Sequence, residues 1–432
     1  MDGLENQMEL ASMSSISRFA VRRLTLTNFR CYEYLRLDID SIAVVLSGPN
    51  GVGKTNVLEA LSMLVPGRGL RGAKLSEISR KTVIEEQTSG PRAWAVAARL
   101  SGFEDPIDIG TGYQPTLNGG VDRRTVRIDG ETERSQQALT NFMRLHWLTP
   151  QMDRLFQEGA AKRRQFLDRL VSIWDPAHVG RISAYERAMR ERLKLLRSQP
   201  SPDPAWLLAL EDNMASRGVA IAAARADLVT RLAPVAAKSW GPFPGALLAL
   251  EGDIHDWLSK GPALEAEESF RVVLGADRER DGTLGQTHAG PQRTDVLVRH
   301  ALKGDPAGRC STGEQKAMLI ALVLANVRIF TCEYGEAPVL LLDEVGAHLD
   351  QDRREVLFTE ILSLAGQVWF TGTDPNIFSG LKDIKDRSPK LVMVFSFNRI
   401  ISLSGKFFFN FLKAFSVAKI GLFFDNFFKV SK

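Results

Sequence analysis

An eight-residue segment near the start of the chain places glycines, a lysine and a threonine at the spacing GxxxxGK[ST]. Glycines at these positions let backbone N–H groups converge on phosphate oxygens. Lys54 can then reach the β- and γ-phosphates of a nucleotide, and Thr55 can offer its hydroxyl to Mg²⁺. The pattern predicts a phosphate-binding loop with nucleotide contacts from Gly48, Pro49, Asn50, Gly51, Val52, Gly53, Lys54, Thr55 and Asn56.

The elements expected on either side make this pattern more specific. An apolar run at 42–46 indicates a buried strand before the loop, and residues 56–61 have helical spacing after it. This strand–loop–helix context is what the pattern requires, and it disfavours a glycine-rich turn without a ligand. The glycine- and arginine-rich segment 66–72 is expected to form a mobile basic loop near the nucleotide, with Arg71 as a further candidate ligand.

Two carboxylates follow an aliphatic run about 290 residues later. Asp343 and Glu344 come directly after the strand expected at 339–342. Solvated acids at a strand end would explain them if they stood alone. Beside a phosphate loop, however, the first carboxylate typically holds Mg²⁺ and the second can polarise an attacking water. We therefore predict Asp343 and Thr55 as the metal ligands and Glu344 as the catalytic base.

A third segment, 311–315, begins a strongly apolar helix. Ser311 can cap this helix, and the N–H groups of its first turn favour an anion. For this segment alone, an ordinary capped helix is the simpler interpretation. The order of the segments is nevertheless that of ABC-type ATPases, in which such a signature acts on the nucleotide of another subunit. The candidate signature residues are Ser311, Gly313, Glu314 and Gln315.

Changes of composition along the chain predict a helical lobe inserted into an α/β body. The order of the motifs resembles that of ABC/SMC-type P-loop ATPases, and this resemblance implies an ATPase head with an inserted helical lobe as the fold class. Strand signals fade near residue 152, where Ala, Leu, Arg and Glu take over at helical spacing, and they return near residue 270. The predicted segments are a loose N-terminus (1–17), the N-terminal part of the ATPase body (18–151), the helical lobe (152–269), the C-terminal part of the body (270–385) and an atypical tail (386–432).

The tail differs from the rest in composition. It holds eleven of the 23 phenylalanines and a net charge of +6, which leaves −2 for the remaining chain. The overall charge of +4 therefore does not by itself indicate nucleic-acid binding. The tail is either an amphipathic segment for a membrane or partner, or read-through sequence foreign to the fold. We favour the second interpretation.

Several classes of protein are disfavoured by composition. The three cysteines are widely spaced, which argues for a reducing compartment and against disulfides or a zinc site. The six histidines are scattered singly. No signal peptide and no uninterrupted bilayer-length apolar run is visible, so we expect a cytoplasmic protein without a membrane partner.

Taken together, these motifs resemble those of the RecF family, bacterial recombination-mediator ATPases related to SMC and ABC heads. The resemblance runs from about residue 18 to 381, and its most specific parts are Lys-Arg-Arg-x-Phe-Leu-Asp at 162–168 and Gly-Pro-x-Arg-x-Asp at 290–295. The family usually has an acid where Gln151 stands. A glutamine can also contact Mg²⁺ or water, so Gln151 is kept as a catalytic candidate. The tail does not resemble the family's last strands.

The resemblance implies a weak, DNA-dependent ATPase that acts as a switch. ATP and Mg²⁺ would be its cofactors, and ATP would join two copies into a homodimer with two composite sites. Lys54, Thr55, Asp343 and Glu344 would act in cis, and the signature would act in trans. The family implies binding to single-stranded and gapped duplex DNA, and RecA loading with RecR- and RecO-type mediators. The processes implied are gap repair, replication restart and the SOS response.

Local basic clusters give modest support for DNA binding. One cluster lies at 162–164 and another along a helical arm that also contains Arg187 and Arg192; solvated helix faces are the alternative. An SMC-like structural chromosome ATPase is disfavoured because the helical insertion is short. A transporter ATPase is disfavoured because no histidine follows the last core strand, at 370–373. The candidate DNA-binding residues are Lys162, Arg163, Arg164, Arg190, Lys194 and Arg197.

Overall fold

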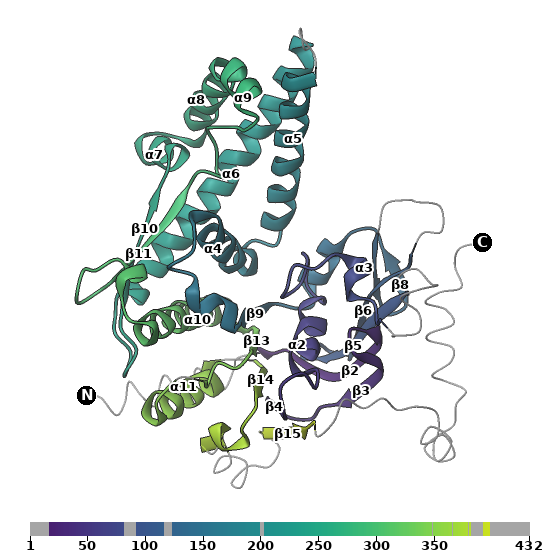
Figure 1. Ribbon diagram of the computed structural model, residues 1–432. Helices are drawn as coiled ribbons and strands as arrows, with labels where there is room; N and C mark the ends of the chain where they lie inside the picture. The colour runs from purple at the N-terminus through teal and green to yellow at the C-terminus, as the bar shows by residue number, and fades with distance from the viewer. Residues whose placement is uncertain are drawn as a thin grey trace. The chain divides into compact units, whose positions relative to one another are not determined.

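The protein divides into two compact units, each of which is described by itself. In this computed structural model the first unit comprises residues 1–148, 335–347 and 358–432, and the second comprises 149–334 and 348–357. Figure 1 labels the helices and strands of both. The structure describes residues 17–81, 92–115, 123–198, 203–347, 349–364, 366–378, 380–381 and 392–397.

A five-stranded parallel sheet carries the phosphate loop in the first unit. Its strand order is β15-β4-β14-β13-β9, and each neighbouring pair is parallel. Every residue of β4, β13 and β14 is buried, which explains why these strands appear in the sequence as continuous apolar runs. The strands are β4 (Ala43–Ser47), β9 (Leu145–Leu148), β13 (Val339–Leu342), β14 (Val368–Gly372) and β15 (Val392–Ser396).

The first unit also contains an antiparallel sheet of six strands and a two-stranded parallel pair, β1-β12. The order of the six-stranded sheet is β3-β2-β5-β6-β7-β8. An Asp-Gly turn joins β7 and β8: Asp129 and Gly130 both have positive φ, at 47° and 90°. The strands are β2 (Ala20–Phe29), β3 (Tyr32–Asp38), β5 (Trp94–Ser101), β6 (Ile107–Tyr113), β7 (Arg124–Ile128) and β8 (Glu131–Glu133).

Short elements connect these sheets, and α2 follows the phosphate loop directly. The helix begins at Lys54, two residues before the start expected from its apolar spacing. The buried core of the unit includes Phe29, Trp94 and Trp369. The connecting elements are β1 (Ser17–Arg18), α2 (Lys54–Ser62), α3 (Leu75–Ile78), η1 (Gln136–Asn141), β12 (Glu336–Ala337) and η4 (Pro375–Phe378), while α11 (Gln351–Leu364) is divided between the two units.

The second unit is mainly helical. The region of helical spacing expected from about residue 152 contains α4, α5 and α6, and α5 runs alongside α6 (Figure 1). Its elements are η2 (Pro150–Arg154), α4 (Ala160–Trp174), α5 (His178–Ser198), α6 (Pro204–Ala236), β10 (Ala246–Glu251), α7 (Asp253–Lys260), α8 (Ala263–Ala276), α9 (Arg278–Leu284), β11 (Asp295–His300), η3 (Ala307–Arg309) and α10 (Thr312–Tyr334).

The long helix α10 is apolar on most of its surface. Within the described residues it is the one helix long and apolar enough, by composition, to cross a membrane. Two thirds of that apolar window, 67%, is buried inside the protein, as in the core helix of a globular unit. The helix belongs to the second unit, whereas the segment expected from composition placed it with the C-terminal part of the body. The segment boundaries drawn from composition stay a prediction.

The tail contributes one strand to the parallel sheet, which corrects the interpretation of it as foreign to the fold. Residues 392–396 form β15, which pairs in parallel with β4. The backbone N–H of Phe397 donates to the carbonyl of Ser47 (2.8 Å), and the Phe397 side chain is buried. A four-residue apolar stretch sufficed for an edge strand, and the surrounding phenylalanine- and lysine-rich composition hid it. The rest of the tail, 398–432, lies outside the described residues.

Candidate nucleotide-binding site

The backbone of the phosphate loop requires glycine at Gly53. This residue caps α2 with a φ of 105°, and a Cβ there would lie 2.5 Å from the Tyr32 hydroxyl and 2.7 Å from the Cys31 sulfur. Glycine avoids both the strain and the clash. It thereby lets α2 begin at Lys54, with no side-chain cap at its start and no acidic residue in the first turn. Such a helix start favours an anion.

Lys54 lies in a water-poor cradle made by its own loop. Its ammonium group donates to the carbonyl oxygens of Gly48 (2.6 Å) and Pro49 (2.8 Å), and the residue is 5% exposed. Burial lowers the pKa of Lys54, and the charges of Glu344 and Asp343 oppose that shift. The structure therefore brings the predicted lysine together with both predicted carboxylates.

The predicted metal ligands are in direct contact. The hydroxyl of Thr55 donates to Asp343 Oδ1 over 2.9 Å. Hydroxyl and carboxylate oxygens suit Mg²⁺, which usually takes one or two carboxylates and fills its shell with phosphates and water. The residues present therefore fit Mg²⁺ bound together with a nucleotide. The part of the chain that the structure describes contains no group of three or more His, Cys, Asp or Glu that could hold a metal ion.

Thr371, at the end of β14, contacts the carboxylate of Asp343 and the backbone of Glu344, and sequence analysis missed it. Its hydroxyl donates to Asp343 Oδ1 (2.7 Å) and accepts the backbone N–H of Glu344 (2.9 Å). Glu344 has a φ of 51°, a strained conformation for a residue with a side chain. One signal was available: neighbouring parallel strands end at the same edge of a sheet, so a polar residue ending β14 lies beside the residues that end β13.

The side of α2 next to the loop carries a buried carboxylate, Glu59. It is 1% exposed and accepts hydrogen bonds from Arg30 (2.5 and 2.8 Å) and Arg71 (3.0 Å). Arg71 also donates to the side-chain oxygen of Asn56 (2.9 Å). Asn56 and Arg71, the two candidate nucleotide-binding residues outside the eight-residue loop, are thus hydrogen-bonded to each other. Arg30 and Glu59 are further members that the motif did not indicate.

Arg124 fixes the start of the basic loop that follows α2. It is partly buried, and all five of its N–H donors find neutral acceptors. Three of these acceptors are backbone carbonyls of residues 63–67, directly after α2. The first part of the basic loop at 66–72, which was expected to be mobile, is therefore anchored. The acceptors are Thr111 Oγ1 (2.6 Å), Gly67 O (2.9 Å), Gln136 Oε1 (3.0 Å), Val65 O (3.2 Å) and Met63 O.

The signature residues lie in the second unit, at the start of α10. Ser311 and Glu314 form a capping box: the Glu314 N–H donates to Ser311 Oγ (3.3 Å), and the Ser311 N–H donates to Glu314 Oε2 (3.0 Å). Lys303 pairs with the same carboxylate, and these contacts lower the pKa of Glu314 to about 2. Ser311 is exposed, while Gln315 is buried and donates to the carbonyl of Cys310 (2.7 Å). At Gly313 a Cβ would approach only Arg353, at 3.7 Å.

The predicted DNA-binding cluster at 162–164 separates into residues of different kinds. Lys162 is exposed, whereas Arg163 forms a two-pronged ion pair with Asp295 (2.7 and 2.8 Å). Arg164 donates to the carbonyl of Thr294 (2.8 Å). The two segments most specific to the family resemblance therefore bind each other. Gln151, the remaining catalytic candidate, is an exposed residue of η2 in this unit.

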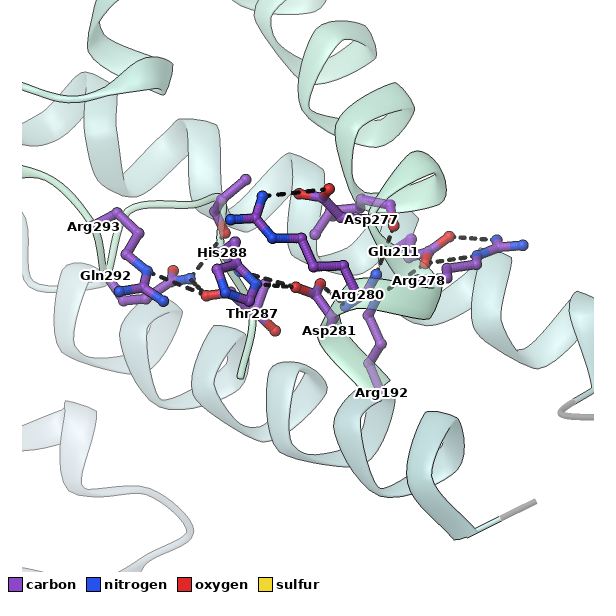
Figure 2. Close-up of polar contacts among 12 residues, drawn as sticks. Arg192, Glu211, Asp277, Arg278, Arg280, Asp281, Thr287, His288, Gln292 and Arg293 are labelled. Carbon is purple, nitrogen blue, oxygen red and sulfur yellow. Dashed lines mark hydrogen bonds and ion pairs between the residues drawn. The ribbon is translucent and has the colours of Figure 1, made fainter. Parts of the chain in front are cut away.

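The basic residues of the arm helix α5 lie on different faces of the helix, some exposed and one buried. Arg190, Lys194 and Arg197 are exposed, as a DNA-binding face requires. Arg192, which the sequence placed in the same cluster, is fully buried and pairs with Glu211 (2.9 Å) and Asp281 (2.7 Å), as Figure 2 shows. Including Arg192 in the cluster was wrong, because its helical phase differs from that of the other three.

The comparisons with known proteins agree with one another. A family model described as RecF/RecN/SMC N terminal domain matches residues 20–385. A protein named DNA replication and repair protein RecF from Mesorhizobium japonicum is 47% identical over 363 residues, which cover 84% of this chain and 93% of that protein. A protein of the same name from Rhizobium meliloti is 46% identical, with 83% and 94% covered.

A solved structure, titled "Structure of the recombination mediator protein RecF-ATPrS in RecFOR pathway", is similar in fold. Its TM-score is 0.72 at 21% identity, and the match covers 84% of this chain and 94% of that one. At this identity the likeness shows the fold alone. Together with the family match, it confirms the predicted α/β ATPase head with helical insertion.

Proposed function

The chain belongs to the RecF family, and from that premise we propose that it is an ATP-dependent DNA-binding protein of recombinational gap repair and replication restart. Its relatives are named DNA replication and repair proteins, and a solved RecF structure is titled as an ATP complex in the RecFOR pathway. We place its action in the cytoplasm, where these processes take place in bacteria.

One observation carries the proposal of ATP binding. Thr55 Oγ1 and Asp343 Oδ1 are 2.9 Å apart beside a buried Lys54, although the two segments are almost 290 residues apart in sequence. Lys54 would exchange its loop carbonyls for β- and γ-phosphate oxygens, and Thr55 and Asp343 would hold Mg²⁺. The bound ion would neutralise charge on the phosphates. Glu344, held by Thr371, would accept a proton from the attacking water.

ATP would also join two copies of the chain. Ser311 and Gly313 of one copy would contact the nucleotide of the other, and slow hydrolysis would release the dimer. The dimer would bind single-stranded and gapped duplex DNA and help RecA loading with RecR- and RecO-type mediators, in support of the SOS response. For the DNA contacts we propose the exposed basic side chains Lys162, Arg190, Lys194 and Arg197.

Sizing the protein with and without ATP and gapped DNA tests this function. Wild-type protein should shift from monomer to dimer with ATP. Lys54→Ala should stay monomeric and lose roughly 100-fold in ATP affinity, because charged hydrogen bonds to the phosphates are lost. Glu344→Gln should bind ATP normally and accumulate as a dimer. Unchanged ATP affinity in Lys54→Ala would refute the phosphate-loop assignment, and wild-type hydrolysis in Glu344→Gln would show that another residue is the base.

A further inference from the structure

Three arginines contact the segment 291–295 of the second unit, and the segment itself contains a fourth. Arg225 donates to the carbonyl of Pro291 (2.6 Å), and Arg164 donates to the carbonyl of Thr294 (2.8 Å). Arg163 pairs with Asp295, and Arg293 belongs to the segment itself. Four guanidinium groups therefore lie at five consecutive residues.

The loop that presents Arg293 is fixed by its neighbours. The Gln292 side chain donates to the carbonyl of Ala289 (2.8 Å) and accepts the hydroxyl of buried Tyr185 (2.6 Å). Gly290 has a φ of 131°, and a Cβ there would lie 2.3 Å from the same hydroxyl, so the chain cannot shift toward it. Figure 2 shows Gln292 and Arg293 side by side on this loop. Arg293 itself is exposed.

The charges of the four arginines are only half compensated. Arg225 holds Asp168 through two hydrogen bonds (2.7 and 2.8 Å), and Arg163 holds Asp295 in the same way. Within the described residues, Arg164 and Arg293 donate only to backbone carbonyls, Arg293 over a long 3.3 Å to Thr287. Most of their N–H donors are therefore available. Burial and the charges of Arg225 and Arg293 lower the pKa of Arg164, and the carboxylates of Asp295 and Asp168 oppose this shift without cancelling it.

We propose that Arg164 and Arg293 form a binding site for a backbone phosphate of DNA, which rests on the proposed function. A phosphodiester supplies the missing negative charge and accepts the two-pronged hydrogen bonding that a guanidinium offers. The rigid loop holds Arg293 in place before the phosphate arrives, so little side-chain entropy is lost on binding. Arg163 and Arg225 are positioning residues, because their donors are used within the protein.

Fluorescence anisotropy of a labelled gapped duplex, titrated with the full chain at several salt concentrations, tests this site. Removing one phosphate contact should reduce the slope of log K against log salt by about one and weaken binding about tenfold near 0.1 M salt. We expect this result for Arg293→Gln and Arg164→Gln. Arg280→Gln is the matched control, since Arg280 is an exposed arginine of α9 with only a loose ion pair to Asp277 (3.9 Å).

Two further variants separate the site from the fold. Arg163→Gln should lower the melting temperature without changing the salt slope. Arg293→Lys should keep the salt slope but bind DNA several-fold more weakly, because a lysine lacks the guanidinium fork. If Arg293→Gln does not fold, Arg293→Lys takes its place in the test. Wild-type slopes in both glutamine variants would overturn the site while the proposed function stands, and so would an equal loss in Arg280→Gln. Wild-type protein that does not bind DNA would overturn both.

Discussion

The hydroxyl of Thr371 contacts both residues on which the proposed chemistry depends, at the carboxylate of Asp343 and at the backbone N–H of Glu344. It orients Asp343 as a donor and holds the backbone of Glu344 as an acceptor, with both hydrogen bonds in a buried setting. Removing it would leave the Glu344 N–H without a partner in a left-handed conformation that is already strained. Thr371 is therefore a positioning residue for the proposed base.

Thr371→Val keeps the shape of the side chain and removes its hydroxyl. We expect ATP hydrolysis to fall at least tenfold, since misplacing a catalytic group by about 1 Å can cost roughly 100-fold. ATP affinity should change by less than about threefold, because Lys54 and Thr55 remain. Thr371→Ser should restore hydrolysis. Steady-state rates and ATP titrations measure both quantities, and a wild-type rate in the valine variant would exclude a positioning role.

At the residue scale, sequence analysis could propose members of the candidate site where the signal is local. The spacing of Lys54 and Thr55 follows from one continuous loop, and Asp343 follows from a strand directly before it. Thr371 could not be found in this way, because its role depends on how β13 and β14 pair. Arg163 and Arg164 are adjacent in sequence, yet only the fold shows that one is fully engaged by Asp295 and the other is not.

At the scale of elements, the cap at the start of α10 contains a carboxylate whose pKa is lowered by its partners. Glu314 closes the capping box and pairs with Lys303, and these contacts lower its pKa from 4.5 to about 2. The folded state therefore binds this proton less tightly than the unfolded state. The ionised Glu314 side chain therefore stabilises the folded state above pH 4.5, and this contribution is lost as the pH falls toward 2.

Glu314→Gln removes this titration. We expect the melting temperature of the wild type to fall between pH 4.5 and 2 more steeply than that of the variant, and the two curves to be parallel above pH 5. The measurement is a series of thermal melts across this range. Glu104→Gln, a change at an exposed loop residue of the first unit, is the control and should follow the wild type. Parallel wild-type and Glu314→Gln curves down to pH 2 would contradict the capping role.

Elements were predictable where periodicity or burial marks them strongly. The continuous apolar runs of β4, β13 and β14 and the long helices α4, α5 and α6 were all expected. The helical period could also have separated Arg192 from its neighbours, since Arg190, Lys194 and Arg197 are spaced by four and three residues and Arg192 is not in phase. The edge strand β15 was not expected, because its pairing with β4 joins residues about 350 positions apart.

At the scale of the whole molecule, the last described strand borders the phosphate loop. Besides pairing along β4, it brings Phe397 against Gly48, where a Cβ would lie 2.3 Å from the Phe397 carbonyl oxygen. The family match ends at residue 385, so this strand lies beyond the matched region. Its contacts nevertheless reach the loop that carries Lys54.

Two truncations test what this strand contributes. A chain ending after residue 391 should melt roughly 5 °C lower and bind ATP more weakly, because β4 loses a neighbour and a few kcal/mol of pairing and burial. A chain ending after Phe397 keeps β15 and should match the full chain in both respects. Thermal melts and ATP titrations separate the two cases. Equal behaviour of the two truncated chains would show that β15 does not support the site.

The position of β4 also matters while the protein is being synthesised. Both of its neighbours in the sheet, β14 and β15, are encoded after residue 367. At roughly 5–20 residues per second, the ribosome needs about 16–65 s to travel the roughly 325 residues from the start of β4 at Ala43 to the start of β14 at Val368. The antiparallel sheet and the helices of the second unit can form during this interval, whereas β4 waits as an unpaired apolar strand. A stop codon anywhere before β14 therefore releases a chain with an exposed, aggregation-prone strand instead of a smaller working ATPase.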